Sequence, residues 1–481
     1  MNISFLIVVV YLVLMFVMGF VLTRRSKNTS EMFVGNSSLN LILLVPLLFG
    51  EVIAASSTTG TAQGGYTQGI SAIWVFVGKG LGSIVFAYVL VKFFNQAGKA
   101  GAMSVPEAFN WRFDGRLRVL MMLIFAIPVS MICASQVTAL ASLLGPMIGV
   151  DTGILIVVAG IVFALLALAG VRGIAKMNII NSFMIIFGIV LVAVICVMSV
   201  GGVAGMIERL PAGFDNLIYP NAGEIGGQFI SALLAYCVTV SPANVCYSTG
   251  SVSVSRKAMV ITGAMSMVFA LFPTLIGMCG AIATPGVNPN TILYSMPASI
   301  SPVLSGVACM AVMAAVISTA PFFYLSFSTV FVRDIVLPLR PATSEKGQMR
   351  IAVATILVFM VVVIWMALNT SSIFGQIVGA NHIKACAGFL LLVALVSKRL
   401  SNNAAFWSLL ISGGLSVYWH FSGSVFGLAV DPLWPALGLS VVLMVAISAF
   451  DWQRGRRDYE AFAKRRDEAL AHAAEDAAED R

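Results

Sequence analysis

The chain has 481 residues, of which 59% are hydrophobic and only 10% are charged, and its mean hydropathy is +0.98. A soluble protein carries about 25% charged residues, so the composition excludes a soluble globular protein and indicates an all-α polytopic membrane protein. The long, unbroken apolar runs exclude a transmembrane β-barrel, whose strands alternate over short segments. The seven cysteines have no metal-ligand spacing, so we interpret them as small buried hydrophobic residues.

Apolar runs of about 17–25 residues predict membrane spans, and thirteen such runs follow one another along the chain. No basic residues precede the first run and no small-residue cleavage site follows it, so we predict a retained span and not a signal peptide. The thirteen predicted spans cover about residues 3–23, 41–66, 72–95, 118–148, 152–171, 178–200, 225–250, 257–283, 298–328, 350–368, 371–396, 403–421 and 431–450.

Lysine and arginine residues between the predicted spans fall almost entirely on one side of this arrangement. Arg209 is the exception, in a loop on the other side. Because cytoplasmic loops are enriched in these residues, we predict that the N-terminus lies outside and the C-terminus inside. The charged segment 451–481 is then a short solvated helix on the cytoplasmic side, with a disordered tip.

Two predicted spans lose their apolar character halfway across the membrane. Leu41–Gly69 starts as LILLVPLLF and continues with Gly50, Glu51 and a run of small and hydroxyl residues; Ile225–Gly250 turns polar around Pro242, which disrupts a helix. Loosened backbone in a span is tolerated where it lines a polar cavity, which is how transporters build binding sites.

These interrupted spans are the second and the seventh, and this spacing predicts two inverted repeats of five helices each. The predicted organisation is an extra N-terminal helix and loop (1–40), a first repeat (41–200), a second repeat (225–396), two peripheral helices (397–450) and a cytoplasmic tail (451–481).

Six segments along the chain are distinctive: Glu31–Leu39 (EMFVGNSSL), Gly60–Gly69 (GTAQGGYTQG), Ser104–Phe113 (SVPEAFNWRF), Gly170–Asn178 (GVRGIAKMN), Ser241–Lys257 and Met313–Thr319 (MAAVIST). They resemble, in the same order, segments of the sodium/solute symporter family, which includes sodium–galactose, sodium–proline and sodium–sialic acid transporters. The likeness runs over the first eleven spans, and it implies a LeuT-like inverted-repeat fold with sodium-driven transport.

This resemblance implies a sodium site built from the carbonyl oxygens of Gly50, Ile53 and Ala315 and the hydroxyls of Ser318 and Thr319. A hard cation binds several carbonyl and hydroxyl oxygens, and an interrupted helix frees carbonyls for it. The alternative for both hydroxyls is a hydrogen bond to a carbonyl one turn earlier in the same helix.

The chain departs from some family members at positions that build a second sodium site. Asn178 stands where several have Asp, and Pro321 and Phe322 stand where some have hydroxyl residues. We therefore expect one sodium ion per solute. Coupling to protons stays open, because Glu51 could titrate.

Lys79 lies in the middle of the third predicted span, where a charge costs a few kcal/mol at least. By resemblance it occupies a position that touches substrate in the sugar-transporting branch. Lys79 could bind an anionic group of the solute or form an internal ion pair with Glu51, and the two are compatible. Uncharged solute contacts are expected from the interrupted spans, with a satisfied backbone hydrogen bond as the alternative for each hydroxyl: Ser56, Ser57, Ser241 and Asn244.

His382 and Lys384 are unexpected in the eleventh span. Either they face an outer vestibule, or the span begins later than residue 371, and we favour the later start. Glu107 and Arg112 are expected to support the structure of a cytoplasmic loop.

The sequence contains no catalytic constellation and no GxxxxGK[ST] motif, which argues against an enzyme and against ATP-driven transport. We predict a sodium-coupled symporter of the cell membrane that imports a small organic solute by alternating access, without organic cofactor, nucleic acid or obligatory protein partner. The solute is expected to be an organic acid or an amino-acid-like zwitterion. The alternatives are a proton-coupled carrier of the same fold, for example for a nucleobase, and a sensor that no longer transports.

Overall fold

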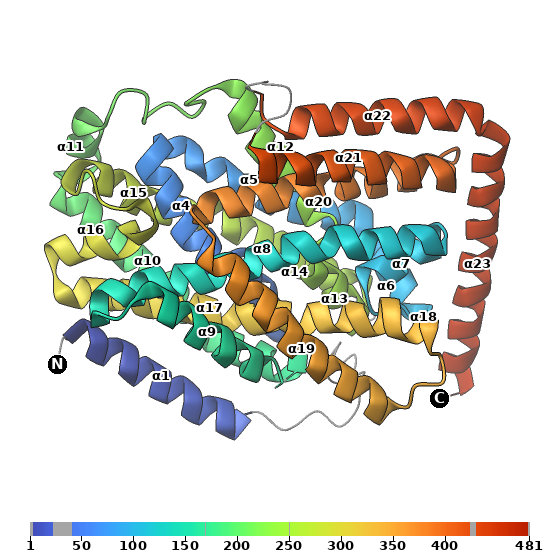
Figure 1. Cartoon of the computed structure of the whole chain (residues 1–481), viewed down its shortest axis with the longest axis horizontal. Coiled ribbons are helices and arrows are strands. Elements are labelled where there is room, and N and C mark those ends of the chain that lie inside the picture. The colour runs from blue at the N-terminus through green and yellow to red at the C-terminus, as the bar shows by residue number, and fades with distance from the viewer. Residues whose placement is uncertain (1–2, 23–40, 169, 250, 424–429, 480–481) are drawn as a thin grey trace.

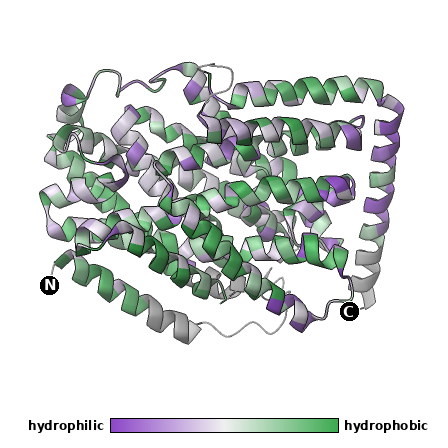
Figure 2. Cartoon of the chain, in the orientation of Figure 1, coloured by the Kyte–Doolittle hydropathy of each residue, from purple (hydrophilic) through white to green (hydrophobic). Residues whose placement is uncertain are grey.

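The computed structural model describes residues 3–22, 41–168, 170–249, 251–423 and 430–479. The regular elements in these ranges are all helices, and most of them run roughly parallel in one bundle (Figure 1). Nine helical segments in the described ranges are long and apolar enough to cross a membrane. Apolar residues dominate the long helices and hydrophilic ones gather towards the ends of the bundle (Figure 2), as expected for a multi-pass membrane protein.

The first predicted interruption is confirmed. Helix α3 spans Leu41–Val52 and helix α4 spans Ala55–Gln68. The backbone N–H of Ile53 still bonds to Phe49, but Ala54 adopts φ −52° and ψ 155°, which ends the α-helical path. The carbonyl of Ile53 accepts the Thr58 hydroxyl at 3.3 Å, so part of the loosened backbone is satisfied by a nearby side chain.

The second interruption is also confirmed. Helix α12 spans Ala222–Tyr236 and helix α13 spans Val240–Thr249. The three residues between them keep short turn hydrogen bonds, and the Thr239 hydroxyl donates to Ala235 O at 2.9 Å. Pro242 lies in the first turn of α13, where its missing N–H removes no intrahelical bond.

Continuous helices surround both interruptions, and α4 and α12 pack against α15 and α20 respectively. In the most apolar stretch of Pro302–Leu339, 83% of the residues are buried inside the bundle, and in that of α20 the share is 78%. The share is only 22% in α22, which therefore lies at the periphery. The remaining long helices are α1 (Ile3–Leu22), α5 (Trp74–Val85), α6 (Val91–Lys99), α8 (Gly115–Ile148), α9 (Thr152–Ala167), α10 (Gly170–Ser199), α14 (Val252–Phe269), α15 (Leu271–Ala283), α17 (Pro302–Phe331), α19 (Glu345–Leu368), α20 (Ile373–Val396), α21 (Asn402–Ser422) and α22 (Leu433–Phe450).

Shorter helical elements connect or continue these helices. They are η1 (Gly69–Ile73), η2 (Phe86–Leu90), α7 (Val105–Arg112), α11 (Gly202–Arg209), η3 (Pro289–Thr291), α16 (Ile292–Ile300), η4 (Val332–Val336) and α18 (Leu337–Leu339).

The late start that we favoured for the eleventh span is wrong. Helix α20 begins at Ile373, close to the predicted residue 371, and it carries both His382 and Lys384 as buried residues. His382 Nε2 lies 3.4 Å from Asp431 Oδ1, at the start of α22. Lys384 lies nearer to the middle of the bundle, where it donates to the Thr239 hydroxyl at 3.4 Å.

The predicted cytoplasmic end is held by an ion-pair cluster around α7. Glu107 accepts from Arg118 and from Arg333, each at 3.0 Å, and Asp334 accepts from Arg118 at 2.6 Å. The Tyr247 hydroxyl of α13 donates to the carbonyl of Ser104, which caps α7. Glu107 therefore has the structural role that we expected, and α13, the second half of the interrupted helix, is fixed to this cluster.

The charged tail forms helix α23 (Trp452–Glu479), which lies across one end of the bundle (Figure 1). The expectation of a solvated helix is wrong for part of it, because Phe462 is only 5% exposed. The buried guanidinium of Arg112 lies 4.7, 5.4 and 5.2 Å from the ring centres of Phe113, Tyr459 and Phe462. Burial lowers the pKa of Arg112 to about 10, so the side chain stays charged at neutral pH and makes cation–π contacts with the docked tail.

Glycines allow several helices to approach closely, as is common in membrane proteins. Helices α5 and α14 show this reciprocally: a Cβ at Gly80 would lie 2.7 Å from the Gly263 carbonyl oxygen, and one at Gly263 would lie 2.6 Å from that of Gly80. Neither backbone can move without separating the helices.

We predict that Gly263→Ala lowers the thermal stability of the detergent-purified protein, by about 1–3 kcal/mol, because the added methyl overpacks the contact. Gly438→Ala is the matched control, since a Cβ there meets nothing within 4 Å and alanine favours a helix by up to about 1 kcal/mol. Equal melting temperatures for the two variants would contradict this packing.

Candidate functional site

The two hydroxyl residues of MAAVIST lie in the middle of α17 and are both buried. Ser318 Oγ donates to the Ala315 carbonyl at 2.7 Å and lies 3.0 Å from Thr319 Oγ1. Thr319 Oγ1 lies 2.8 Å from Ala315 O and 2.8 Å from Gly50 O. The hydrogen bond to the same helix that we considered as the alternative is present, but Thr319 also reaches across to the end of α3.

Gly50 makes this approach possible. A Cβ on it would lie 3.2 Å from Ser318 Oγ and 3.2 Å from Asn178 Nδ2, tighter than ordinary van der Waals contact. Asn178, in α10, donates its amide to the Ser318 carbonyl at 3.2 Å. The last turn of α3 therefore packs between α10 and α17.

The donor set fits a hard monovalent cation. Gly50 O, Ala315 O and the two hydroxyl oxygens form a connected group, in which each oxygen lies 2.7–3.0 Å from at least one of the others. These four oxygens carry only two protons, those of the two hydroxyls. Rotation of the hydroxyls would direct oxygen lone pairs at an ion. The carbonyl of Ile53 is engaged by Thr58, and no described contact joins it to the other four oxygens.

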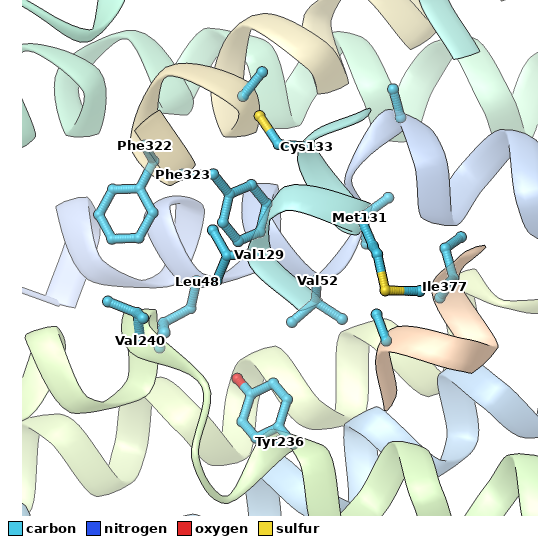
Figure 3. Close-up of a cluster of buried hydrophobic side chains, with 14 of the residues drawn as sticks. Leu48, Val52, Val129, Met131, Cys133, Tyr236, Val240, Phe322, Phe323 and Ile377 are labelled. Carbon is cyan, nitrogen blue, oxygen red and sulfur yellow. The ribbon is translucent and has the colours of Figure 1, made fainter. Parts of the chain in front are cut away.

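A small pocket lies beside the two helix interruptions, with a cavity volume of about 40 Å³. Figure 3 shows part of its surroundings: Tyr236 of α12 points towards Val52 at the end of α3, with Phe323 of α17 near by. The lining residues come from seven helices and the two interruptions: Val52, Ala54, Ser57, Lys79, Ile132, Ala232, Tyr236, Thr239, Phe323, Asn381 and Lys384.

Two of the predicted solute contacts, Lys79 and Ser57, lie together in this pocket. Lys79 Nζ, from α5, donates to Ser57 Oγ, in the first turn of α4, at 3.0 Å. The ammonium also lies 5.6 Å from the ring centre of Phe76. In the pocket, the third predicted span thus contacts the first turn of α4, just after the first interruption.

The other predicted contacts are placed differently. Ser241 and Asn244 are buried in α13 and do not line the pocket, and Ser241 Oγ has no hydrogen-bond partner in the described part of the chain. The backbones of Glu51 and Ser56 belong to α3 and α4, whereas their side chains lie outside the described structure.

Sequence reasoning did not assign Lys384, Asn381, Thr239 and Tyr236 to the solute pocket. The signal for Lys384 was present, because an ionisable residue inside a membrane span indicates a functional site by default, but we explained it by a later span boundary. Tyr236 is the last residue of α12 and Thr239 lies in the second interruption, so the predicted interruption indicated both residues. Asn381 precedes Lys384 by three residues and shares its helix face.

A model of the sodium:solute symporter family matches residues 32–412. The sodium/pantothenate symporter of Haemophilus influenzae is 23% identical over 390 residues, which cover 77% of this chain and 80% of that protein. The sodium/proline symporter of Escherichia coli is 22% identical over 451 residues, covering 86% and 87%.

Solved structures agree on the fold. A Na⁺-coupled sialic acid symporter in a substrate-bound outward-open state matches with a TM-score of 0.77 at 19% identity, over 93% of this chain and 97% of that one. A nucleobase-cation-symport-1 family transporter in a closed conformation matches with a TM-score of 0.58 at 14% identity, over 90% and 99%. The chain therefore belongs to the sodium:solute symporter family and is a multi-pass cell-membrane protein that couples transport of a small organic solute to sodium.

Proposed function

We propose that sodium binds between α3 and α17, at Gly50, Ala315, Ser318 and Thr319, and that the solute binds beside Lys79 and Ser57. The observation that carries this proposal is the 2.8 Å contact between Thr319 Oγ1 and Gly50 O, because it joins the hydroxyl pair to the end of the interrupted helix. Ile53 would join the sodium ligands if its carbonyl exchanged Thr58 for the ion.

Coupling between sodium and solute follows from the positions of the two proposed sites on either side of the first interruption. Gly50 lies in the last turn of α3, and Ser57 lies in the first turn of α4. Sodium would stabilise the end of α3 next to α17, and the solute would stabilise the start of α4 next to Lys79. Each ligand orders the backbone that the other needs, so each raises the affinity for the other by the same factor.

We propose one sodium ion per solute. Asn178 donates its amide to Ser318 O, so it serves as a donor to α17 where an aspartate would offer a charged ligand. Pro321 and Phe322, one turn beyond the hydroxyl pair, are buried and bring no side-chain oxygen. Both observations support a single cation site at this level of α17.

We propose that the solute carries a carboxylate that binds Lys79, either as an organic acid or as a zwitterion. A lysine in the membrane interior needs an anionic partner, and the Lys79 ammonium, which donates to Ser57 Oγ at 3.0 Å, lines the pocket that a carboxylate would enter. Glu51 is the protein's own candidate partner, which the solute would displace or bridge. Ser56, Ser241 and Asn244 remain predicted contacts, the last two for a state in which α13 has moved.

We also propose thirteen spans with the N-terminus outside and the C-terminus inside, and inverted repeats over 41–200 and 225–396. The matching breaks between α3 and α4 and between α12 and α13 support the repeats. The basic cluster around α7 and the tail α23 at one end support a cytoplasmic assignment for that end.

We predict that Ser318→Ala combined with Thr319→Ala raises the sodium concentration for half-maximal effect at least about tenfold, equivalent to about 1.4 kcal/mol, because two of the ligands are lost. The measurement is the melting temperature of the purified protein across a sodium titration, with choline as the replacement ion. Thr329→Ala, in the same helix, is the control, since its hydroxyl bonds only to Leu325 O. Wild-type sodium dependence in the double variant would refute this site.

We predict that Lys79→Ala abolishes sodium-driven uptake of carboxylate solutes found by a thermal-shift screen of small metabolites with and without sodium. Loss of a charge-assisted hydrogen bond costs about 1.5–3 kcal/mol. Lys92→Ala, which removes an exposed lysine of the neighbouring helix α6, should transport normally. Unchanged uptake in Lys79→Ala would leave Lys79 a purely structural role.

A further inference from the structure

The solute pocket contains a second lysine. Lys384 enters it from α20, whereas Lys79 enters from α5, so the two ammonium groups belong to helices far apart in the chain. Lys384 is only 7% exposed, and it lies near the middle of α20, away from both ends of the helix.

The charges around the pocket do not balance. Its described lining has two lysines and no carboxylate. Within the predicted spans the sequence has only two acidic residues, Glu51 and Asp431, and Asp431 lies beside His382 at the start of α22. Even a fully ionised Glu51 paired to the lysines leaves an excess of one positive charge, which is costly in the membrane interior.

The polar groups beside Lys384 favour oxygen acceptors. Asn381, one turn earlier in α20, is 2% exposed, and its Nδ2 has no hydrogen-bond partner in the described part of the chain. A buried donor of this kind costs free energy until an acceptor reaches it. Lys79, Lys384 and Asn381 thus present N–H groups to one small space from two sides.

We propose that Lys384 is a second solute anchor, so that the pocket takes an organic anion with a carboxylate and a second oxygen acceptor and rejects zwitterions. This inference rests on the proposed solute site at Lys79, and it decides between the organic acid and the zwitterion left open there. One anchor binds the carboxylate, while the other, with Asn381, binds a hydroxyl, keto or second carboxylate oxygen. A solute ammonium beside Lys384 would meet a like charge, and like charges in a desolvated site repel strongly.

The test uses matched compound series of three to six carbons. Each series has a carboxylate at one end and a methyl, hydroxyl, carboxylate or ammonium group at the other, for example butyrate, 4-hydroxybutyrate, succinate and 4-aminobutyrate. Binding to the full-length purified protein is measured as the sodium-dependent rise in melting temperature over a concentration series. We expect the hydroxy acids or dicarboxylates to bind most tightly and the ammonium forms to bind least.

Lys384→Met should weaken the preferred acid about 10- to 100-fold, the effect of one charge-assisted hydrogen bond, and should bring it close to the methyl-terminated acid of the same length. Lys384→Arg should recover part of the affinity, since the positive charge is kept. Lys398→Met, just beyond the end of α20, is the control and should bind as the wild type does. A sodium-induced stabilisation that survives in Lys384→Met shows that the variant is folded.

The two proposals fail in different ways. If acids bind but the ammonium forms bind equally well, or if Lys384→Met leaves the order of the series unchanged, the second anchor is refuted while the carboxylate site at Lys79 stands. If no acid in any series stabilises the protein, the carboxylate site itself is refuted. Loss of binding in Lys79→Met with no change in Lys384→Met would leave Lys79 as the one anchor.

Discussion

Backbone polar groups inside a membrane must find partners within the protein, and this constraint governs the centre of the molecule. At the two interruptions the α-helical hydrogen bonds stop, between α3 and α4 and between α12 and α13. Such backbone is tolerated only where neighbouring helices cover it or a polar cavity receives it. Both solutions occur here, because Thr58 and Thr319 bond to carbonyls at the first break and the pocket adjoins both breaks.

The same constraint explains why α17 and α20 are largely buried inside the bundle. Each covers one side of the first interrupted helix, and each contributes polar residues on that side. Ser318 and Thr319 come from α17, and Asn381 and Lys384 come from α20. Polar groups are expensive in a membrane, so they gather where the interrupted backbone already makes the interior polar.

The predicted sodium and solute sites use the two sides of one break, and this gives coupling a simple physical basis. An ion at Gly50 and a solute at Ser57 would both fix a backbone that lacks regular hydrogen bonds. The Tyr247 hydroxyl ties α13, the second half of the other interrupted helix, to the ion-pair cluster around α7. Movement between states would therefore have to exchange contacts at that cluster.

The sequence by itself determined the membrane class and both helix interruptions, because apolar length and local runs of glycine, proline and hydroxyl residues are properties of short segments. The hydroxyl pair Ser318 and Thr319 was predicted from the resemblance of its segment to the symporter family. The sequence also named Lys79, since a lone charge in an apolar run stands out without any structure. Only the tertiary structure decided that Lys384 shares a pocket with Lys79, that Ser241 and Asn244 lie away from it, and that Arg112 holds the tail helix. These depend on how helices distant in the chain are packed and rotated, and the period of a single helix does not specify which face meets which neighbour.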